Sequence, residues 1–227
     1  SVKGIVNKTN KINLKQNLKF AVIGHIEWIT FVQVDQMPSP GIISHSKKSI
    51  ELPAGGGTVI AKKLLELTNN EVHFYASLGR DLYGEHSYKI LNEMGLNLHI
   101  KWSNKSTRRG FSLVNDQGER SITIIGDRLS PRSDDLLDWE ILDHMDGIFI
   151  TAGDKNLFKK SRKAKVLCST PRAGLRSINK SGIKLDALIG SNLDPDENFD
   201  FSDLLIKPKY IVKTEGDKGG IIYPGER

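Results

Sequence analysis

The chain has 227 residues, of which 38% are hydrophobic and 26% charged, a composition typical of globular proteins long enough to bury a core. No apolar stretch approaches the roughly 18–20 residues that span a bilayer, and the lysine-rich start lacks the apolar core of a secretory signal. The sequence therefore predicts neither a membrane span nor a membrane partner, and the single cysteine, Cys168, favours a reducing cytoplasm.

The net charge of +6 raises the question of nucleic-acid binding, because clustered Lys and Arg side chains release counterions from phosphates. The densest basic cluster spans residues 155–165 and contains one aromatic residue, Phe158, for base stacking. We therefore expect a solvated helical face there and no nucleic-acid partner. A basic surface equally favours a small anionic ligand.

The chain is predicted to open with a polar leader, residues 1–19, and a buried strand over residues 20–24. Extended segments follow at 28–34 and 44–52, divided by a Pro- and Gly-rich break. Apolar residues at helical spacing then predict a helix after a glycine triplet. Further elements are expected as strand 72–78, helix 83–94, strand 96–102 and a hairpin of strands 109–115 and 120–125.

From residue 147 onward, strand and helix alternate. Strands are expected at 147–151, 164–169, 187–190 and 210–214, and helices at 156–163 and 175–181. This alternation predicts an α/β fold with a parallel sheet flanked by helices. The extended segments near 28–52 and 109–125 fit poorly in such a sheet, so we expect them to form a small β-sheet appendage inserted at two points.

Three glycine-bearing segments stand out. Gly55, Gly56 and Gly57 open a helix, where backbone N–H groups and a partial positive charge accept hydroxyl oxygens or phosphate. A tight turn that packs the helix on the sheet explains them equally well, and no Gly-Lys-Ser/Thr ending makes them a P-loop. The second segment, 79–84, is expected to be structural, with Asp81 capping the next helix.

The third segment, 214–220, follows a strand, at the edge where open α/β sheets bind ligands. In this order the three segments resemble those of the PfkB/ribokinase family of small-molecule kinases. The resemblance covers residues 20–227 and implies a three-layer α/β/α sandwich with a small β-sheet lid, formed from parts of residues 28–52 and 97–125. It also implies ATP-dependent phosphorylation of a hydroxyl on a small sugar or sugar-like substrate, with ATP and Mg²⁺, and a homodimer through the lid.

The resemblance assigns sugar binding to the glycine triplet and to an Asn-x-Asp pattern whose positions are taken here by His25 and Glu27. An ionised Glu27 still accepts hydrogen bonds from hydroxyls, but its longer arm implies a shifted or different substrate. A family asparagine falls at Ile60, which cannot hydrogen-bond, so the chain resembles a divergent subfamily. A histidine that is merely solvated or packed is the alternative for His25. Arginines at 108, 109 and 128 are either within reach of an anionic substrate or only solvated.

Nucleotide binding is implied for Asn192, Thr214, Gly216 and Gly219, the last three matching a Thr-x-Gly-x-x-Gly pattern at a strand end. Asn192 matches the asparagine of Asn-x-x-Glu, although Pro195 stands at the glutamate position. The carboxylates within 194–197 either replace that glutamate near Mg²⁺ or form an acidic solvated loop. The residues that hold the metal are not identified.

The family's catalytic aspartate lies in a DTxGAGD segment that the 227 residues do not contain. The resemblance therefore implies that this aspartate lies beyond Arg227, that no catalytic residue lies within the chain, and that these residues are inactive alone. The alternative is a non-catalytic sugar- or nucleotide-sensing protein that retains the kinase fold.

Overall fold

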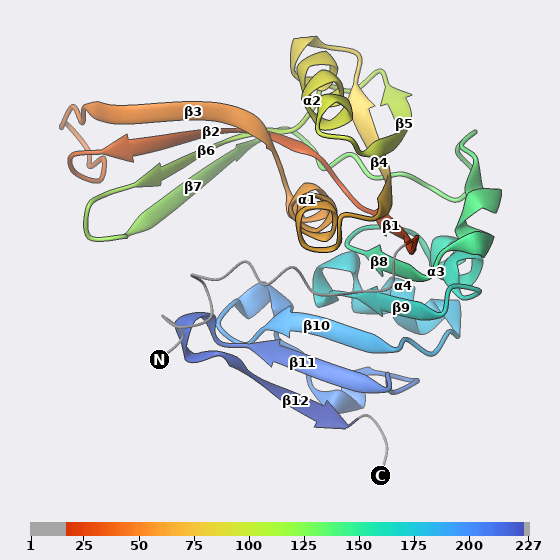
Figure 1. Ribbon diagram of the computed structural model, residues 1–227. Coiled ribbons are helices and arrows are strands. Elements are labelled where there is room, and N and C mark those ends of the chain that lie inside the picture. Colours follow the sequence, from red (N-terminus) through yellow and green to blue (C-terminus); the bar gives the residue numbers. More distant parts are fainter. Residues whose placement is uncertain (1–16, 225–227) are drawn as a thin grey trace.

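The computed structural model describes residues 17–224 (Figure 1). The expected polar leader, residues 1–19, lies outside the described residues except for its last three positions, and Lys19 already begins strand β1. Within the described range, no helix combines the length and the apolar character needed to cross a bilayer.

The main sheet has eight strands in the order β12-β11-β10-β9-β8-β1-β4-β5. All neighbouring pairs are parallel except β11 and β12, which are antiparallel. This confirms the predicted α/β class. The strands are β1 (Lys19–Ile23), β4 (Glu71–Gly79), β5 (Asn97–Ser103), β8 (Gly147–Ile150), β9 (Val166–Ser169), β10 (Ala187–Ser191), β11 (Tyr210–Thr214) and β12 (Gly220–Pro224).

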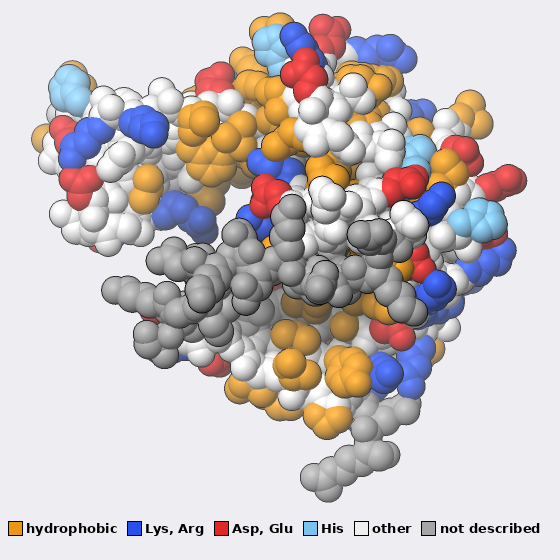
Figure 2. All heavy atoms as spheres, viewed as in Figure 1, with side chains coloured by type: hydrophobic (Ala, Val, Ile, Leu, Met, Phe, Trp, Pro, Cys, Tyr) orange, Lys and Arg blue, Asp and Glu red, His pale blue; other side chains and the backbone are white. Residues whose placement is uncertain are grey.

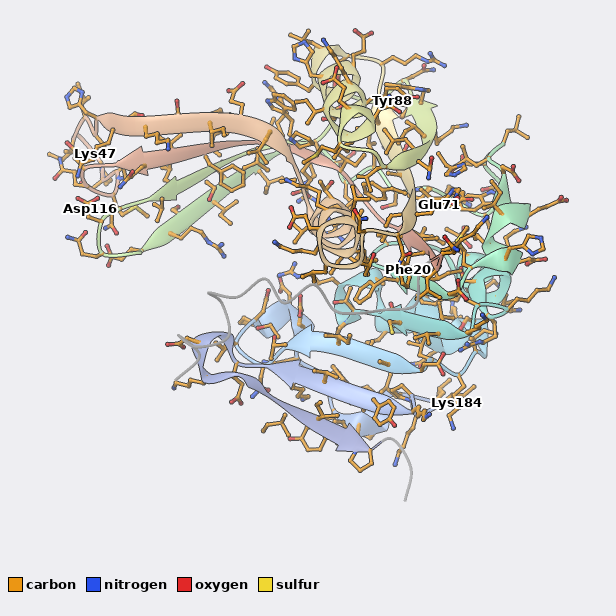
Figure 3. All side chains as sticks on the ribbon, viewed as in Figure 1. Phe20, Lys47, Glu71, Tyr88, Asp116 and Lys184 are labelled. Carbon is orange, nitrogen blue, oxygen red and sulfur yellow. The ribbon has the colours of Figure 1, made fainter. Side chains whose placement is uncertain are left out.

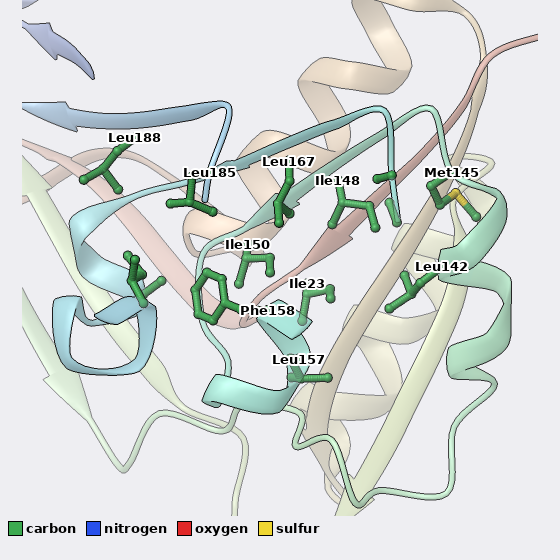
Figure 4. Close-up of a cluster of buried hydrophobic side chains, with 14 of the residues drawn as sticks. Ile23, Leu142, Met145, Ile148, Ile150, Leu157, Phe158, Leu167, Leu185 and Leu188 are labelled. Carbon is green, nitrogen blue, oxygen red and sulfur yellow. The ribbon is translucent and has the colours of Figure 1, made fainter. Parts of the chain in front are cut away.

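Helices cover both faces of this sheet, which confirms the three-layer sandwich (Figure 1). The central strand β1 is buried on both sides, since Ala21 and Ile23 join one apolar core and Val22 joins the other. Leu157 and Phe158 of α3 fill the first core, drawn in Figure 4. The helices are α1 (Gly56–Thr68), α2 (Leu82–Glu93), α3 (Lys155–Ser161) and α4 (Leu175–Ser181). Short 3-10 helices are η2 (Trp139–His144), η3 (Pro171–Ala173), η4 (Pro195–Glu197), η5 (Phe201–Asp203) and η6 (Gly216–Lys218).

A second, four-stranded sheet has the order β3-β2-β6-β7 and extends away from the main body (Figure 1). Its strands are β2 (Glu27–Val34), β3 (Ser46–Ala54), β6 (Arg109–Val114) and β7 (Arg120–Ile125). We call it the small sheet. At its far tip, Lys47 and Asp116 lie together and form an ion pair between the two hairpins (Figure 3).

The predicted lid segment near 97–125 starts too early. Its first strand, β5, pairs with β4 at the edge of the main sheet, in parallel register from His73↔Asn97 to Gly79↔Ser103. Its half-buried residues resemble those of an appendage strand, whereas burial against the second core holds Leu98 and Ile100 in the main sheet. The contribution of this part of the chain to the small sheet therefore begins at Arg109.

The order of the main sheet creates a topological switch point. After β1 the chain passes through β2, β3 and α1 and adds β4 on one side, and only later does it return to add β8 on the other. Loops that leave β1 and β8 therefore diverge at the carboxyl edge. In open α/β sheets, ligands bind in the crevice at such a point.

Candidate functional site

A cleft of about 400 Å³ lies at the carboxyl edge of the parallel strands, beside the switch point. Its walls come from the ends of β1, β8, β9, β10 and β11 and from the first turn of α1. Figure 2 shows a hollow beside the small sheet, with both basic and acidic side chains along its border. The polar residues that line the cleft at the strand ends are His25, Thr151, Thr170, Arg172, Ser191 and Thr214.

The loop after β1 lies against the start of α1. A Cβ on Gly24 would come within 2.8 Å of the Cα of Gly57, and a Cβ on Gly57 would lie 2.8 Å from the backbone nitrogen of His25. Gly55 has a φ of +92°, a backbone conformation that favours glycine. Close packing thus explains Gly24, Gly55 and Gly57, while Gly56 lines the cleft itself.

His25 is 5% exposed and sits at one end of the cleft. Burial, followed by the positive charges of Arg128, Arg108 and Arg172, lowers its pKa to about 3, so the ring is neutral at physiological pH. Its Nε2 accepts a hydrogen bond from the Gly56 N–H at 3.3 Å, which assigns the ring hydrogen to Nδ1. That Nδ1 is buried without a partner among the described residues, and so is free to donate to a ligand oxygen.

Glu27 begins β2 and connects His25 to the small sheet. Its Oε1 lies 3.5 Å from His25 Nε2 and 3.2 Å from Nη1 of Arg108, and the carboxylate side chain is 13% exposed. Glu27 does not itself line the cleft as the described residues define it. Of the two side chains that it contacts, His25 lines the cleft and Arg108 does not.

Of the three arginines named from the sequence, at 108, 109 and 128, one is directed away from the cleft. Arg109 donates to the Tyr83 hydroxyl at 3.0 Å and lies over the Tyr83 ring on the side of α2, so it is directed away from the cleft. Arg108 and Arg128 are not among the residues that line the cleft, but the positive charge of each lowers the pKa of His25. The Nε of Arg108 is buried without a partner in the described part of the chain.

Arg172 holds the acidic loop after β10. Its Nε donates to Glu197 Oε1 at 2.8 Å, and its guanidinium also pairs with Asp194, whose pKa it lowers. The second oxygen of Glu197 accepts the Ser191 N–H. These carboxylates are therefore already engaged, and no group of three metal-ligating side chains occurs within residues 17–224. The loop does not fit a dedicated Mg²⁺ site.

The predicted nucleotide-binding residues gather around the end of β11. Thr214 lines the cleft, and its carbonyl accepts the Asn192 N–H at 2.7 Å. The Asn192 side chain donates to Glu215 at 3.0 Å. Gly216 and Gly219 have φ values of +63° and +91° in the turn between β11 and β12, which opens beside the cleft without lining it. A turn of this kind lets the backbone approach a bound nucleotide.

No protein-family model matches the chain, and no curated protein matches it in sequence. Solved structures match it along most of its length. A ribokinase from Arabidopsis thaliana, complexed with ribose and ATP, shares 19% identity over 94% of this chain and 77% of its own, with a TM-score of 0.66. This chain has the ribokinase fold.

Two further structures with the ribokinase fold match this chain over a similar length and with similar TM-scores. The ribokinase of Thermotoga maritima is 20% identical over 92% of this chain and 76% of its own, with a TM-score of 0.64. Phosphofructokinase-2 of Escherichia coli, in a tetrameric inhibited form, is 13% identical over 93% of this chain and 78% of its own, with a TM-score of 0.67.

Several residues of the cleft were not predicted from the sequence of this ribokinase-fold chain. Thr151, Thr170 and Arg172 all line it, yet they lie in separate segments without a shared short motif. One signal was present. Each strand from β8 to β11 ends in, or is followed by, a Ser or Thr at the carboxyl edge. A hydroxyl recurring at that position marks the edge where ligands bind.

Asp81 has the structural role expected of it. Its carboxylate accepts the Gly84 N–H at 2.8 Å as the cap of α2, and its second oxygen accepts the Thr107 N–H at 2.7 Å. A Cβ on Gly84 would lie 2.1 Å from the Gly79 carbonyl, so this glycine segment is needed for close backbone packing.

Proposed function

We propose that this protein belongs to the ATP-dependent sugar kinases and transfers a phosphoryl group from ATP to a hydroxyl of a small sugar or sugar-like acceptor. The observation that carries the proposal is one cleft that runs from His25 and Gly56 to Thr214 along the switch-point edge, beneath a small sheet. The ribokinase fold supports it, because the Arabidopsis thaliana neighbour is complexed with ribose and ATP.

The acceptor end is the part next to β1. The unpartnered Nδ1–H of His25 donates to an acceptor oxygen, Glu27 accepts from hydroxyls, and the Gly56 backbone lies beside them. Thr151 adds a second buried polar group, a hydroxyl without a partner among the described residues. Unpaired buried polar groups cost free energy, which a bound polyol relieves by supplying the missing hydrogen bonds.

The nucleotide end is the part next to β11. Thr214, Asn192, Gly216 and Gly219 form the rim on which we place ATP, and the glycine turn leaves room for its base and ribose. Mg²⁺ would enter bound to the ATP phosphates, because the acidic loop is already paired with Arg172. The metal would neutralise phosphate charge during transfer.

Phosphoryl transfer also requires a group that accepts the hydroxyl proton. Glu197 is the one carboxylate that lines the described cleft, and both of its oxygens are engaged. We therefore place the catalytic aspartate outside residues 17–224, as the sequence resemblance implies, and expect residues 1–227 to be inactive alone.

The small sheet has two roles in this proposal. We place it as a lid that excludes water from the transfer and as the contact through which two copies form a homodimer. A cytoplasmic location, which the single thiol of Cys168 favours, is part of the same hypothesis.

The test uses the product of the complete encoding gene and, separately, the 227-residue chain. Each is incubated with Mg-ATP and a panel of neutral and charged sugars and polyols, and ADP formation is measured. We expect acceptor-dependent ADP formation by the complete product and none by the 227-residue chain. Turnover by the 227 residues would place the catalytic carboxylate within them.

The absence of a free carboxylate in the described cleft also favours a second candidate, a non-catalytic protein that senses a sugar or nucleotide. Saturable sugar or ATP binding by the complete gene product, without turnover of any acceptor, would establish that function and exclude the kinase.

A further inference from the structure

Arginine side chains gather at the acceptor end of the cleft. The positive charges of Arg108 and Arg128 oppose protonation of His25, and the charge of Arg172 has the same effect. The chain brings the first two together because β6 and β7 are paired: Arg109 lies opposite Ile125, and the next residue, Gly126, would place a Cβ 3.9 Å from the Arg108 Cα. Arg128 follows two residues later.

These arginines differ in the negative charge that surrounds them. Arg172 is compensated by Asp194 and Glu197 on the nucleotide side. Arg108 has an ion pair with Glu27. Arg128 forms no hydrogen bond or ion pair with any residue between 17 and 224, and His25 is neutral. With one carboxylate for two guanidinium groups, the acceptor end carries a surplus positive charge.

Arg128 itself is exposed, so water solvates part of this surplus charge in the unliganded protein. Partial burial, followed by repulsion from Arg108, lowers the pKa of Arg128, and Glu27 is the one group that acts in the opposite direction among its main influences. The buried Nε of Arg108 also lacks a partner in the described structure. Two guanidinium groups held together with unused donors fit a carboxylate or a phosphate, which both accept paired N–H bonds.

We propose, on the basis of the function proposed above, that the acceptor is anionic and that Arg108 and Arg128 bind its carboxylate or phosphate group beneath the small sheet. Arg128 is then a specificity-determining residue, because a neutral sugar leaves it without a partner. The γ-phosphate of ATP must reach the acceptor hydroxyl during transfer, so recognition of an anionic acceptor has to be measured without ATP.

The experiment measures binding to the complete gene product without ATP, by calorimetry and thermal shift. The probes are two matched sets, D-ribose, D-ribonate and D-ribose 5-phosphate, and D-glucose, D-gluconate and D-glucose 6-phosphate. We expect an anionic member to bind more tightly than its neutral parent, and the carboxylate and phosphate members identify which group is recognised. Arg128→Gln should weaken that binding about 10- to 100-fold, the loss expected for a hydrogen bond to a charged group.

Arg176→Gln is the matched control, since it removes the same charge from an exposed position on α4 outside the cleft. It should leave all affinities unchanged. Equal or tighter binding of the neutral sugars, or the lack of any anion binding that depends on Arg128, would overturn the inference. Phosphorylation of a neutral sugar in that case would leave the kinase function standing, whereas the lack of both sugar and ATP binding would remove both. Anion binding that ATP abolishes and Arg128→Gln leaves intact would assign the anion to the nucleotide end and also overturn the inference.

Discussion

His25 occupies a position where a neutral hydrogen-bond donor is fixed by its surroundings. Burial and three nearby guanidinium groups oppose protonation, and the Gly56 N–H directs the ring hydrogen to Nδ1. An ionised carboxylate at this position could only accept hydrogen bonds, and an amide could both donate and accept them. The ring thus offers one donor of fixed direction, which suits recognition of a single acceptor oxygen.

This arrangement predicts a pH dependence of stability. The unfolded chain protonates His25 near pH 6.5 and the folded chain near pH 3, so the unfolded state binds more protons between these values and stability falls as the pH falls through that window. Between pH 7 and pH 5, the free energy of unfolding lost through His25 is roughly 1–2 kcal/mol. In urea titrations, His25→Asn should lose less stability over this interval than the unmodified chain.

His99 contributes in the same direction, because burial and then His73 lower its pKa to about 4, so the comparison between variants is needed to isolate His25. His144→Asn, at an exposed position on η2, serves as the control and should keep the full dependence. An identical pH dependence in His25→Asn would show that the ring is protonated in the folded protein.

Glu27 is expected to act in binding through its contacts with both Arg108 and His25. Glu27→Ala removes a hydrogen-bond acceptor for the ligand hydroxyls, so the affinity for a neutral sugar should fall by about 1–3 kcal/mol. Calorimetry with the tightest-binding neutral sugar measures this. Glu51→Ala, on the neighbouring strand where Glu51 accepts from Thr30, is the matched control. Unchanged affinity in Glu27→Ala would remove Glu27 from the site.

Helix α2 begins at the Asp81 carboxylate, whose two oxygens both accept backbone hydrogen bonds. Asp81 caps the helix through Gly84 and fixes the chain before β6 through the buried Thr107 N–H. Asp81→Ala should therefore reduce the free energy of unfolding by about 2–4 kcal/mol, the sum of a lost cap and an unsatisfied buried donor. Asp81→Ser keeps a capping oxygen and should recover part of this loss. Denaturant titration of both variants is the measurement, and equal losses would contradict the capping role.

The elements differ in how well the sequence predicts them. Helix α4 and strand β11 coincide with their predicted bounds, because apolar spacing and flanking glycines define them locally. Strand β5 falls within the predicted lid segment 97–125 since its half-buried pattern is the same in either sheet, and only pairing with β4 decides between them. Strand β12 was missed because Gly220–Pro224 is an exposed edge strand without an alternating pattern.

Site residues that are far apart in the sequence are also hard to predict from it. Short patterns pointed to His25 and Thr214, which both line the cleft. Arg172 was missed because its ion pair with Glu197 joins segments 25 residues apart, through the parallel neighbours β9 and β10. Which strands are adjacent is a property of the folded sheet, so the charge balance at the acceptor end becomes visible only in the structure.

The last prediction concerns association of two copies through the small sheet. Phe31 pairs with Ile50 on one side and Ser112 on the other, and Ser112 pairs with Ile122, so these side chains share one face. Phe31, Ile50 and Ile122 are 37%, 54% and 50% exposed. Apolar side chains gathered on one exposed sheet face are typical of an interaction surface.

We expect light scattering to give the mass of a dimer for the unmodified protein and of a monomer for Ile50→Lys combined with Ile122→Lys, because two charges cannot be desolvated in an apolar contact without partners. The control combines Leu136→Lys and Val166→Lys, which add the same charges at exposed positions outside the small sheet and should leave the dimer intact. Circular dichroism checks that all variants remain folded. A monomeric unmodified protein, or a dimer that survives both substitutions in the small sheet, would place any association elsewhere and leave the small sheet with the role of a lid alone.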